Sequence, residues 1–262
     1  MLLIQTLGMI LANLLAIGVI VLVVWFFRSR GPVTESKLRR LVKPDTIPPR
    51  DVLPCGGDLG ATAALLRALD LGGTPRDLIR ALMVDWLQQK AIFIHPAAKK
   101  KLRSFGADVQ LELTFPEEIS QMDGAAALLY DTVRAWADED GCLQQSELYQ
   151  AARNDAQRVD NIMRQLVHEG RRALREIGGC TPERKKSKFG LSDDNRELYT
   201  PKGIRLARDT ASFAKYAAKA PDVRGQAAVL GTAAGCIRST DPACVLADAI
   251  FDGMTAGKQV FG

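Results

Sequence analysis

The sequence is poor in the residues that most metal sites and nucleophilic catalysts require. It has two histidines, His95 and His168, and five cysteines that are scattered along the chain, with no C-x-x-C pair. Two histidines exclude a histidine-rich metal site, and neither has an acid or a cysteine at a spacing typical of a catalytic pair. The odd number of dispersed cysteines favours free thiols over a disulfide framework.

Loops typical of nucleotide or calcium binding are missing as well. Gly72-Gly73-Thr74 and Cys55-Gly56-Gly57 lack the G-x-x-x-x-G-K-[ST] frame, and glycines that end helices account for them better. Asp138–Asp140 and Asp193-Asp194 lack the spacing of an EF-hand. The sequence therefore predicts a protein that is not an enzyme, with no cofactor and no metal site.

Charge is absent from the first 27 residues, where Gln5 and Asn13 are the only strongly polar interruptions. About 20 apolar residues suffice for a helix to cross a hydrocarbon core of roughly 30 Å. A cleaved signal peptide would have basic residues before a shorter apolar run and small residues at its end, whereas this run ends in Trp25-Phe26-Phe27-Arg28. A buried core helix is the other alternative, but a charge-free run of this length is unusual for one. We predict a transmembrane helix over residues 1–27.

Positive charge is concentrated directly after this segment. From Arg28 to Arg50 the chain has seven basic and two acidic residues, a net charge of +5 that equals the net charge of the whole chain. The positive-inside rule then predicts a single-pass protein of the cell inner (cytoplasmic) membrane, with the N-terminus outside and the domain in the cytoplasm. The residues predicted to contact the anionic membrane surface are Arg28, Arg30, Lys37, Arg39, Arg40 and Lys43.

Residues 28–58 are predicted to be a basic, proline-rich juxtamembrane linker. Five prolines between residues 32 and 54 forbid a long helix. A short helix at Ser36–Val42 would place Leu38, Leu41 and Val42 on one face and lie on the membrane surface, and a solvated charged turn is the alternative.

Residues 59–115 predict a first winged-helix-like unit. A helix from Leu59 is followed by a second helix that Thr74 caps, with a proline at its first position. Strands are expected over Ala91–Pro96 and Val109–Phe115, joined by a basic turn. Helix, turn, helix and hairpin is the order typical of a winged helix.

The same order returns in residues 116–200, which predict a second winged-helix-like unit. Its expected elements are a helix from Pro116 through Trp136, a short strand at Cys142-Leu143, helices over Ser146–Ala152 and Ala156–Ile177, and a strand over Glu197–Thr200. An irregular helical domain with two small hairpins is the alternative. Residues 201–262 predict a C-terminal helical segment, so the fold class is mainly α with small β-hairpins (α+β).

Basic residues fill both predicted wing turns and are candidates for contact with an anionic partner: Lys99, Lys100, Lys101, Arg103, Arg184, Lys185, Lys186 and Lys188. Nucleic acid is one such partner, since lysines in a wing can meet phosphates. The expected recognition helix, Thr74–Lys90, carries mixed charges, and residues 51–262 have 28 basic and 28 acidic side chains. Because net charge supplies most of nonspecific DNA affinity, a protein or lipid partner is favoured.

The order of elements resembles the cytoplasmic C-terminal part of the YciQ-like predicted membrane proteins, known as domain of unknown function 2207. The segments that carry the resemblance are TPRDLIRALMVDWLQQKAIFI, PEEISQMDGAAALLYDTVRAW, GCLQQSELYQAA and YTPKGIRLARDTASFAKYAAKA. That family has a large extracytoplasmic domain and further membrane helices, while this chain has one predicted span. The resemblance implies a membrane-tethered cytoplasmic module of winged-helix-like units without an assigned activity, and it implies no catalytic residue.

These observations together predict a membrane-anchored cytoplasmic protein-interaction or scaffold module. Its expected partners are the membrane, through one span and the basic juxtamembrane stretch, and other proteins, as a homo-oligomer or within a membrane complex. The alternative is a membrane-tethered winged-helix regulator that binds nucleic acid. DNA binding that falls steeply with salt would favour this alternative.

Overall fold

The computed structural model describes residues 31–96, 111–116, 122–185, 194–220, 224–236 and 241–261. In these ranges the chain is a mainly helical α+β protein with nine α-helices and two small antiparallel sheets, which confirms the expected class. The predicted membrane segment, residues 1–27, lies outside them. Among the helices that the structure does describe, none is both long and apolar enough to cross a membrane.

The elements follow the order predicted from the sequence, with one additional strand, β4, that was not predicted. The helices are α2 (Glu35–Val42), α3 (Leu59–Leu69), α4 (Pro75–Gln88), α5 (Gly124–Arg134), α6 (Gln145–Asn154), α7 (Ala156–Glu176), α8 (Pro201–Lys219), α9 (Gln226–Ala233) and α10 (Pro242–Phe261). The strands are β1 (Phe93–Pro96), β2 (Leu111–Thr114), β3 (Cys142–Gln144), β4 (Cys180–Lys185) and β5 (Asp194–Tyr199). Short 3-10 turns occupy Pro44–Thr46 and Pro54–Gly57.

Side chains just before three helices explain where those helices begin. The Asp58 carboxylate accepts a hydrogen bond from the amide of Ala61 at the start of α3. At the start of α4, Thr74 and Asp77 form a reciprocal capping box, and the Thr200 hydroxyl accepts from the first turn of α8. Such caps satisfy amides that have no partner within the helix. A proline also occupies the first position of both α4 and α8, where its missing N–H costs nothing.

Each β-hairpin is extended by a segment distant in sequence. β1 pairs with β2, and β2 also pairs with β3, with Leu113 opposite Leu143. β4 pairs only with β5 among the named strands, but Val33 forms a bridge to Tyr199 at the end of β5. The two hydrogen bonds of that bridge are 2.8 and 2.7 Å long. The segment before α2 is thereby fixed to the second hairpin.

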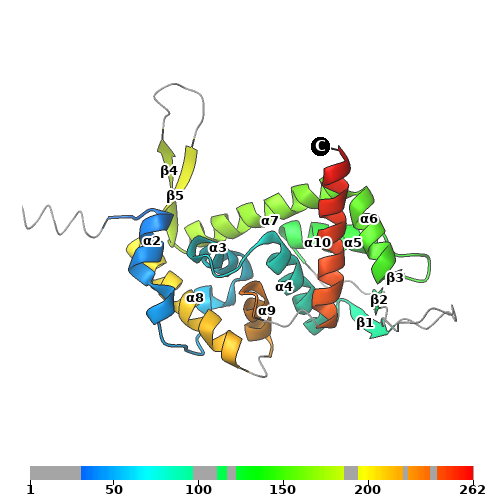
Figure 1. Ribbon diagram of the computed structural model, residues 1–262, viewed down its shortest axis with the longest axis horizontal. Coiled ribbons are helices and arrows are strands. Elements are labelled where there is room, and N and C mark those ends of the chain that lie inside the picture. The colour runs from blue at the N-terminus through cyan, green and yellow to red at the C-terminus, as the bar shows by residue number, and fades with distance from the viewer. Residues whose placement is uncertain are drawn as a thin grey trace, which may run out of the picture.

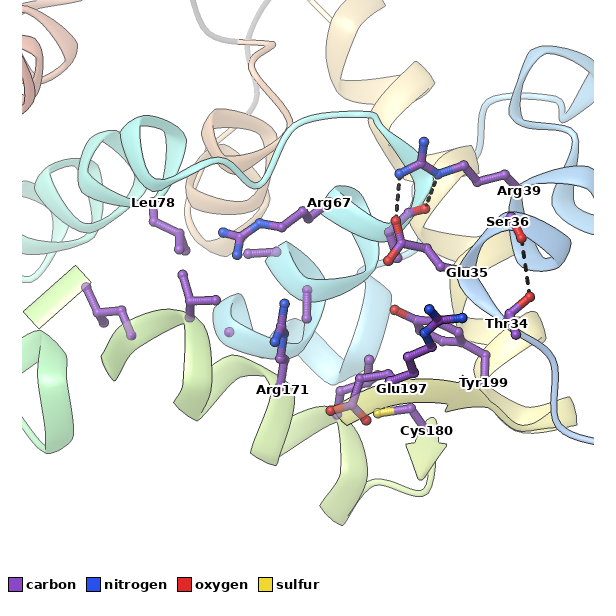
Figure 2. Close-up of a pocket in the computed structure, with 18 of the residues that line it drawn as sticks. Thr34, Glu35, Ser36, Arg39, Arg67, Leu78, Arg171, Cys180, Glu197 and Tyr199 are labelled. Carbon is purple, nitrogen blue, oxygen red and sulfur yellow. Dashed lines mark hydrogen bonds and ion pairs between the residues drawn. The ribbon is translucent and has the colours of Figure 1, made fainter. Parts of the chain in front are cut away.

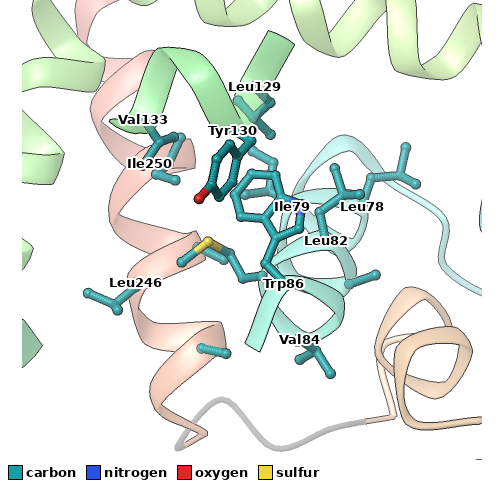
Figure 3. Packing of buried hydrophobic residues seen from close by; sticks show 14 of the residues in the cluster. Leu78, Ile79, Leu82, Val84, Trp86, Leu129, Tyr130, Val133, Leu246 and Ile250 are labelled. Carbon is teal, nitrogen blue, oxygen red and sulfur yellow. The ribbon is translucent and has the colours of Figure 1, made fainter. Parts of the chain in front are cut away.

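The larger core lies among α4, α5, α6, α10 and the first half of α7. Figure 3 shows α4 facing α5 and α10, with Trp86 next to Tyr130. The two rings meet edge to face, with centroids 5.3 Å apart, and the Tyr130 hydroxyl donates to the carbonyl of Ala91 at 2.9 Å. Burying one large apolar side chain stabilises a fold by roughly 1.5–3 kcal/mol, so this cluster is a main source of stability.

A second core lies among α2, α3, α8, the end of α7 and the hairpin β4–β5. Its members include Leu38 and Val42 from α2, Leu65 from α3 and Tyr199 from β5, all buried. The apolar face of α2 therefore packs inside the protein, and of its apolar side chains only Leu41 stays exposed. The segment forms the helix, so the solvated turn is not what the structure shows.

Hydrogen bonds from α8 fix the rest of this segment. The Ser212 hydroxyl donates to the carbonyl of Pro48 at 2.6 Å, and the Lys215 ammonium donates to the carbonyls of Asp45 and Ile47. Figure 1 shows α7 extending from α2, α3 and the hairpin β4–β5 at one end to α6 and α10 at the other. One long helix thus contributes to both cores.

Candidate functional site

A cavity of about 740 Å³ lies where α2, α3, α7 and the hairpin β4–β5 meet (Figure 2). Apolar side chains such as Leu78 and Val167 form part of its lining. The charged side chains that line it are Arg39, Arg40, Arg67, Arg171 and Arg196, with Glu35 and Glu197. Five positive charges against two negative ones give the lining a formal charge of +3, which favours an anionic ligand.

A close crossing of α3 and α7 brings the two sides of the cavity together. Gly60 and Gly170 face each other there, and a Cβ atom on Gly170 would lie 2.5 Å from the carbonyl oxygen of Gly60. Residues seven apart return to the same face of a helix, so Arg67 lies on the side of α3 that carries Gly60. Arg171 directly follows Gly170 on α7. The crossing therefore places both arginines at one cavity.

Arg67 from α3 and Arg171 from α7 both reach into this cavity (Figure 2). Arg67 donates from Nε and from one Nη to the carbonyl of Gly73, at 3.1 and 2.6 Å. Burial lowers the pKa of Arg67, and the positive charge of Arg171 lowers it further. Within the described part of the chain, neither guanidinium forms an ion pair with a carboxylate.

Both glutamates of the lining are already paired with other arginines. Glu35 binds Arg39 at 2.7 Å, and Glu197 forms an ion pair with Arg175. Burial would raise the pKa of Glu197, but the hydrogen bonds and the charge of Arg175 outweigh it and hold that pKa below its ordinary value. Burial raises the pKa of the neighbouring Cys180 to about 12, so this thiol stays protonated at neutral pH.

The residues predicted to contact the membrane surface divide into three groups. Arg39 and Arg40 line the cavity, and Arg39 also donates to the carbonyl of Ala68. Lys37 and Lys43 are exposed on and just after α2. Arg28 and Arg30 lie outside the described residues.

Most of the residues predicted to contact an anionic partner also fall outside the described ranges. The structure places Arg184 and Lys185 in β4, at the end of the hairpin. The others, which the structure does not describe, are Lys99, Lys100, Lys101, Arg103, Lys186 and Lys188. The structure therefore leaves their proposed role open.

Sequence reasoning missed Arg67 and Arg171 as candidate site residues. A signal for Arg67 was present, because it is the only charged residue between Leu59 and Leu69 in an otherwise apolar helix. Arg171 carried no such signal, since α7 has many charged residues. Only the crossing of α3 and α7 identifies it.

The helix expected to recognise DNA, α4, is largely covered. Eight of its 14 residues are buried. Arg80 donates to both carboxylate oxygens of Asp248 on α10, at 2.8 and 2.7 Å, and Arg76 forms an ion pair with Asp252 on the same helix. The cations of α4 thus bind α10 and are not presented to a partner.

The outer face of α7 is exposed and rich in nitrogen donors. Its exposed residues are Gln157, Arg158, Asn161, Arg164, Gln165, His168, Arg171, Arg172 and Glu176. Three of the arginines form ion pairs within or next to the helix, for example Arg164 with Asp160 at 2.9 Å. Arg171 is the exception on this face.

A second cavity, of about 490 Å³, lies between the start of α4, α7 and α10. Met163, Phe251 and Met254 make it mostly apolar, and at its edge Lys258 binds Asp160 at 2.7 Å. Its charged groups are thus paired with one another. In the residues that can be described, no three potential metal ligands come together.

No family model, curated protein or solved structure matches this chain.

Proposed function

We propose that the chain is a membrane-anchored cytoplasmic interaction or scaffold module whose binding site is the arginine-lined cavity. The observation that carries this proposal is that α2, which follows the predicted membrane span, forms one wall of the cavity through residues such as Ser36 and Arg40. Thr34 lies only seven positions after Phe27, and seven extended residue steps span at most about 25 Å. The cavity would therefore lie close to the membrane surface.

The packing of the juxtamembrane segment supports the same function. Val33 pairs with β5, and Leu38 is fully buried in the second core. A module attached in this way would hold its site at a fixed height and orientation relative to the membrane, whereas a free linker would let it tumble. Such fixed presentation suits a protein that assembles partners at a surface.

We further infer that the fold contains the two winged-helix-like units, residues 59–115 and 116–200, and that the cavity lies where they join. α3 comes from the first unit, while α7, β4 and β5 come from the second. Ligand sites occur preferentially at such junctions. The resemblance to YciQ-like membrane proteins, which implies a tethered module of winged-helix-like units, agrees with this proposal.

Photo-crosslinking in native membranes tests the proposed function. A photoreactive residue at Ser36, which is exposed at the cavity, should give discrete protein adducts. The matched position is Arg158, which is exposed on α7 about 20 Å along the helix from Arg171. Equal adducts from both positions, or none from Ser36, would contradict an interaction site at the cavity.

Nucleic-acid binding is the second candidate, and the exposed face of α7 is the observation that favours it. This helix precedes the hairpin β4–β5, as a recognition helix precedes a wing. Three of its arginines are engaged in ion pairs, which weakens the face as an anion-binding surface. The structure thus moves the nucleic-acid hypothesis from α4, whose arginines bind α10, to α7.

A salt series with the full-length chain and duplex DNA separates the two candidates. A DNA-binding face would give affinity that falls steeply with salt, and Arg171→Gln and Arg172→Gln would weaken it equally. The interaction module predicts weak DNA binding at physiological salt. Tight, salt-dependent binding would therefore replace the first proposal with the second.

A further inference from the structure

We propose that the arginine-lined cavity binds a phosphate group, with Arg67 and Arg171 as its two cationic ligands. The phosphate is either the headgroup of an anionic lipid or a free anion. The lipid source rests on the proposed function, because it requires the cavity to lie at a membrane surface. Phosphate binding itself does not depend on any protein partner.

The two arginines of one cavity are the first argument. Two like charges that line one cavity repel each other, and burial strengthens that repulsion because the local dielectric is lower than in water. Burial is the larger cause of the lowered pKa of Arg67, and the positive charge of Arg171 adds to it. An anion between the two guanidinium groups would turn the repulsion into two attractive contacts.

The second argument is that, in the described part of the chain, no carboxylate forms an ion pair with Arg67 or Arg171. Glu35 and Glu197 are the carboxylates of the lining, and each is paired with another arginine. At the contact of α4 with α10, by contrast, Arg76 and Arg80 have aspartate partners. Among the described residues, the cavity therefore holds two guanidinium groups that form no ion pair, although the charge of Arg171 also acts on the more distant Glu197.

Donor geometry points to phosphate in particular. Arg67 donates to Gly73 from Nε and one Nη, so its other Nη is left for a ligand, and no hydrogen bond joins Arg171 to another described residue. Phosphate offers acceptor oxygens in several directions, so it can bind two arginines that come from different helices. A volume of about 740 Å³ leaves room for the group that carries the phosphate.

The test uses the full chain in nanodiscs of phosphatidylcholine alone, with inorganic phosphate as the probe. Thermal unfolding is followed as phosphate replaces chloride at constant ionic strength, for the wild type, Arg171→Gln and Arg172→Gln. Arg172 is the matched control because it is the next residue of α7, does not line the cavity and pairs with Glu176. A ligand that binds only the folded state raises the unfolding midpoint, and the stabilisation grows with the logarithm of its concentration above the dissociation constant.

We expect the midpoint to rise with phosphate for the wild type and for Arg172→Gln. For Arg171→Gln the apparent phosphate affinity should fall at least about tenfold, since a hydrogen bond between charged groups is lost. An equal rise in all three proteins would indicate the general stabilisation that excluded salts give, and would overturn the proposal. The absence of any phosphate-specific rise in the wild type would overturn it as well.

Nanodiscs of equal parts phosphatidylcholine and phosphatidylglycerol then identify the source. If the headgroup fills the cavity, added phosphate should no longer raise the wild-type midpoint, while an unchanged response would assign the site to a free anion. These measurements contain no partner protein. A failure here therefore leaves the cross-linking at Ser36 intact, and a failure of that cross-linking leaves phosphate binding intact.

Discussion

Arginine serves different purposes in two regions of this molecule. Where α4 meets α10, Arg80 is a bidentate partner of Asp248, and Arg76 binds Asp252 while its guanidinium lies 4.8 Å from the ring centre of Phe251. Arg67 and Arg171 both line the cavity between α2, α3 and α7, and among the described residues neither forms an ion pair. Arg80 is only 16% exposed, whereas Arg171 is exposed on α7, so the paired arginine is the more buried of the two.

The difference separates charge that holds the fold together from charge that is open to a ligand. A half-buried ion pair resists separation, because removing one partner leaves the other charge desolvated and uncompensated. Two like charges in a cavity contribute nothing of this kind, and they oppose folding slightly until an anion binds. The predictions below ask whether the two regions really differ in this way.

The largest effect is expected at the contact of α4 with α10. Asp248→Ala should lower the free energy of unfolding by about 2–3 kcal/mol, because Arg80 loses both carboxylate oxygens while its side chain is only 16% exposed. Urea unfolding of the full chain in detergent measures the loss. Asp252→Ala is the control, since its side chain is 52% exposed and its ion pair should contribute less than about 1 kcal/mol. Equal losses would show that this contact does not depend on the buried pair.

The crossing of α3 and α7 should give the next largest effect. Gly170→Ala places a Cβ 2.5 Å from the carbonyl oxygen of Gly60, so the two helices must separate and the cavity must change shape. We expect a loss of about 1–2 kcal/mol in unfolding free energy, although alanine favours a helix by about 1 kcal/mol. Phosphate binding should be lost with it.

Gly231→Ala is the matched change in a helix, because its Cβ would approach only a side-chain carbon, that of Ala217, at 3.3 Å. It should stay within about 1 kcal/mol of the wild type in the same unfolding measurement. If Gly170→Ala behaves in the same way, the close crossing is not what sets the shape of the cavity.

A smaller effect should appear in acid. The pKa of Glu197 is lower in the folded chain than in the unfolded one, so its pair with Arg175 stabilises the fold above the ordinary carboxyl value of 4.5. This contribution is lost as the pH falls below 4.5 through the folded pKa. Unfolding midpoints measured against pH should therefore drop more steeply for the wild type than for Glu197→Gln in this window. If the two proteins give parallel curves of midpoint against pH, the ion pair of Glu197 with Arg175 does not contribute to stability.

The helices and their caps could be predicted because their signals are local. Thr74 and the proline after it marked the start of α4, and glycines marked the ends of α3 and α7. The apolar pattern also predicts a last helix over Asp241–Met254, whereas α10 runs from Pro242 to Phe261. The helix expected from Pro116 is wrong at its start, because Asp123 is extended and α5 begins only at Gly124.

The contacts that build the cavity could not be predicted, because they join residues far apart in sequence. Nothing near Val33 indicates that it pairs with Tyr199, and nothing near Leu143 indicates that it lies opposite Leu113. An apolar stripe on a short helix indicates that this face of the helix is covered, but it does not indicate whether lipid or protein covers it. For this segment we left a helix on the membrane surface and a solvated turn as alternatives, and the structure shows a helix, α2, that is covered by protein.

The smallest expected effect is the most direct test of the comparison between the two regions. The change in unfolding free energy should have opposite signs at two neighbouring residues, Arg171 and Arg172. Arg171→Gln should raise the unfolding free energy of the phosphate-free chain by about 0.2–0.5 kcal/mol, since it removes a charge that repels Arg67. Arg172→Gln should lower it by about 0.3 kcal/mol, since it removes an exposed pair with Glu176 one turn away.

Chemical unfolding at low ionic strength without phosphate measures both changes, and high salt should shrink both of them because these groups are solvent-exposed. A stabilised Arg171→Gln protein that no longer responds to phosphate would show that this charge is kept for a ligand at a cost to the fold. If Arg171→Gln instead lowers stability as Arg172→Gln does, Arg171 helps to hold the fold together. The two regions would then use their arginines alike.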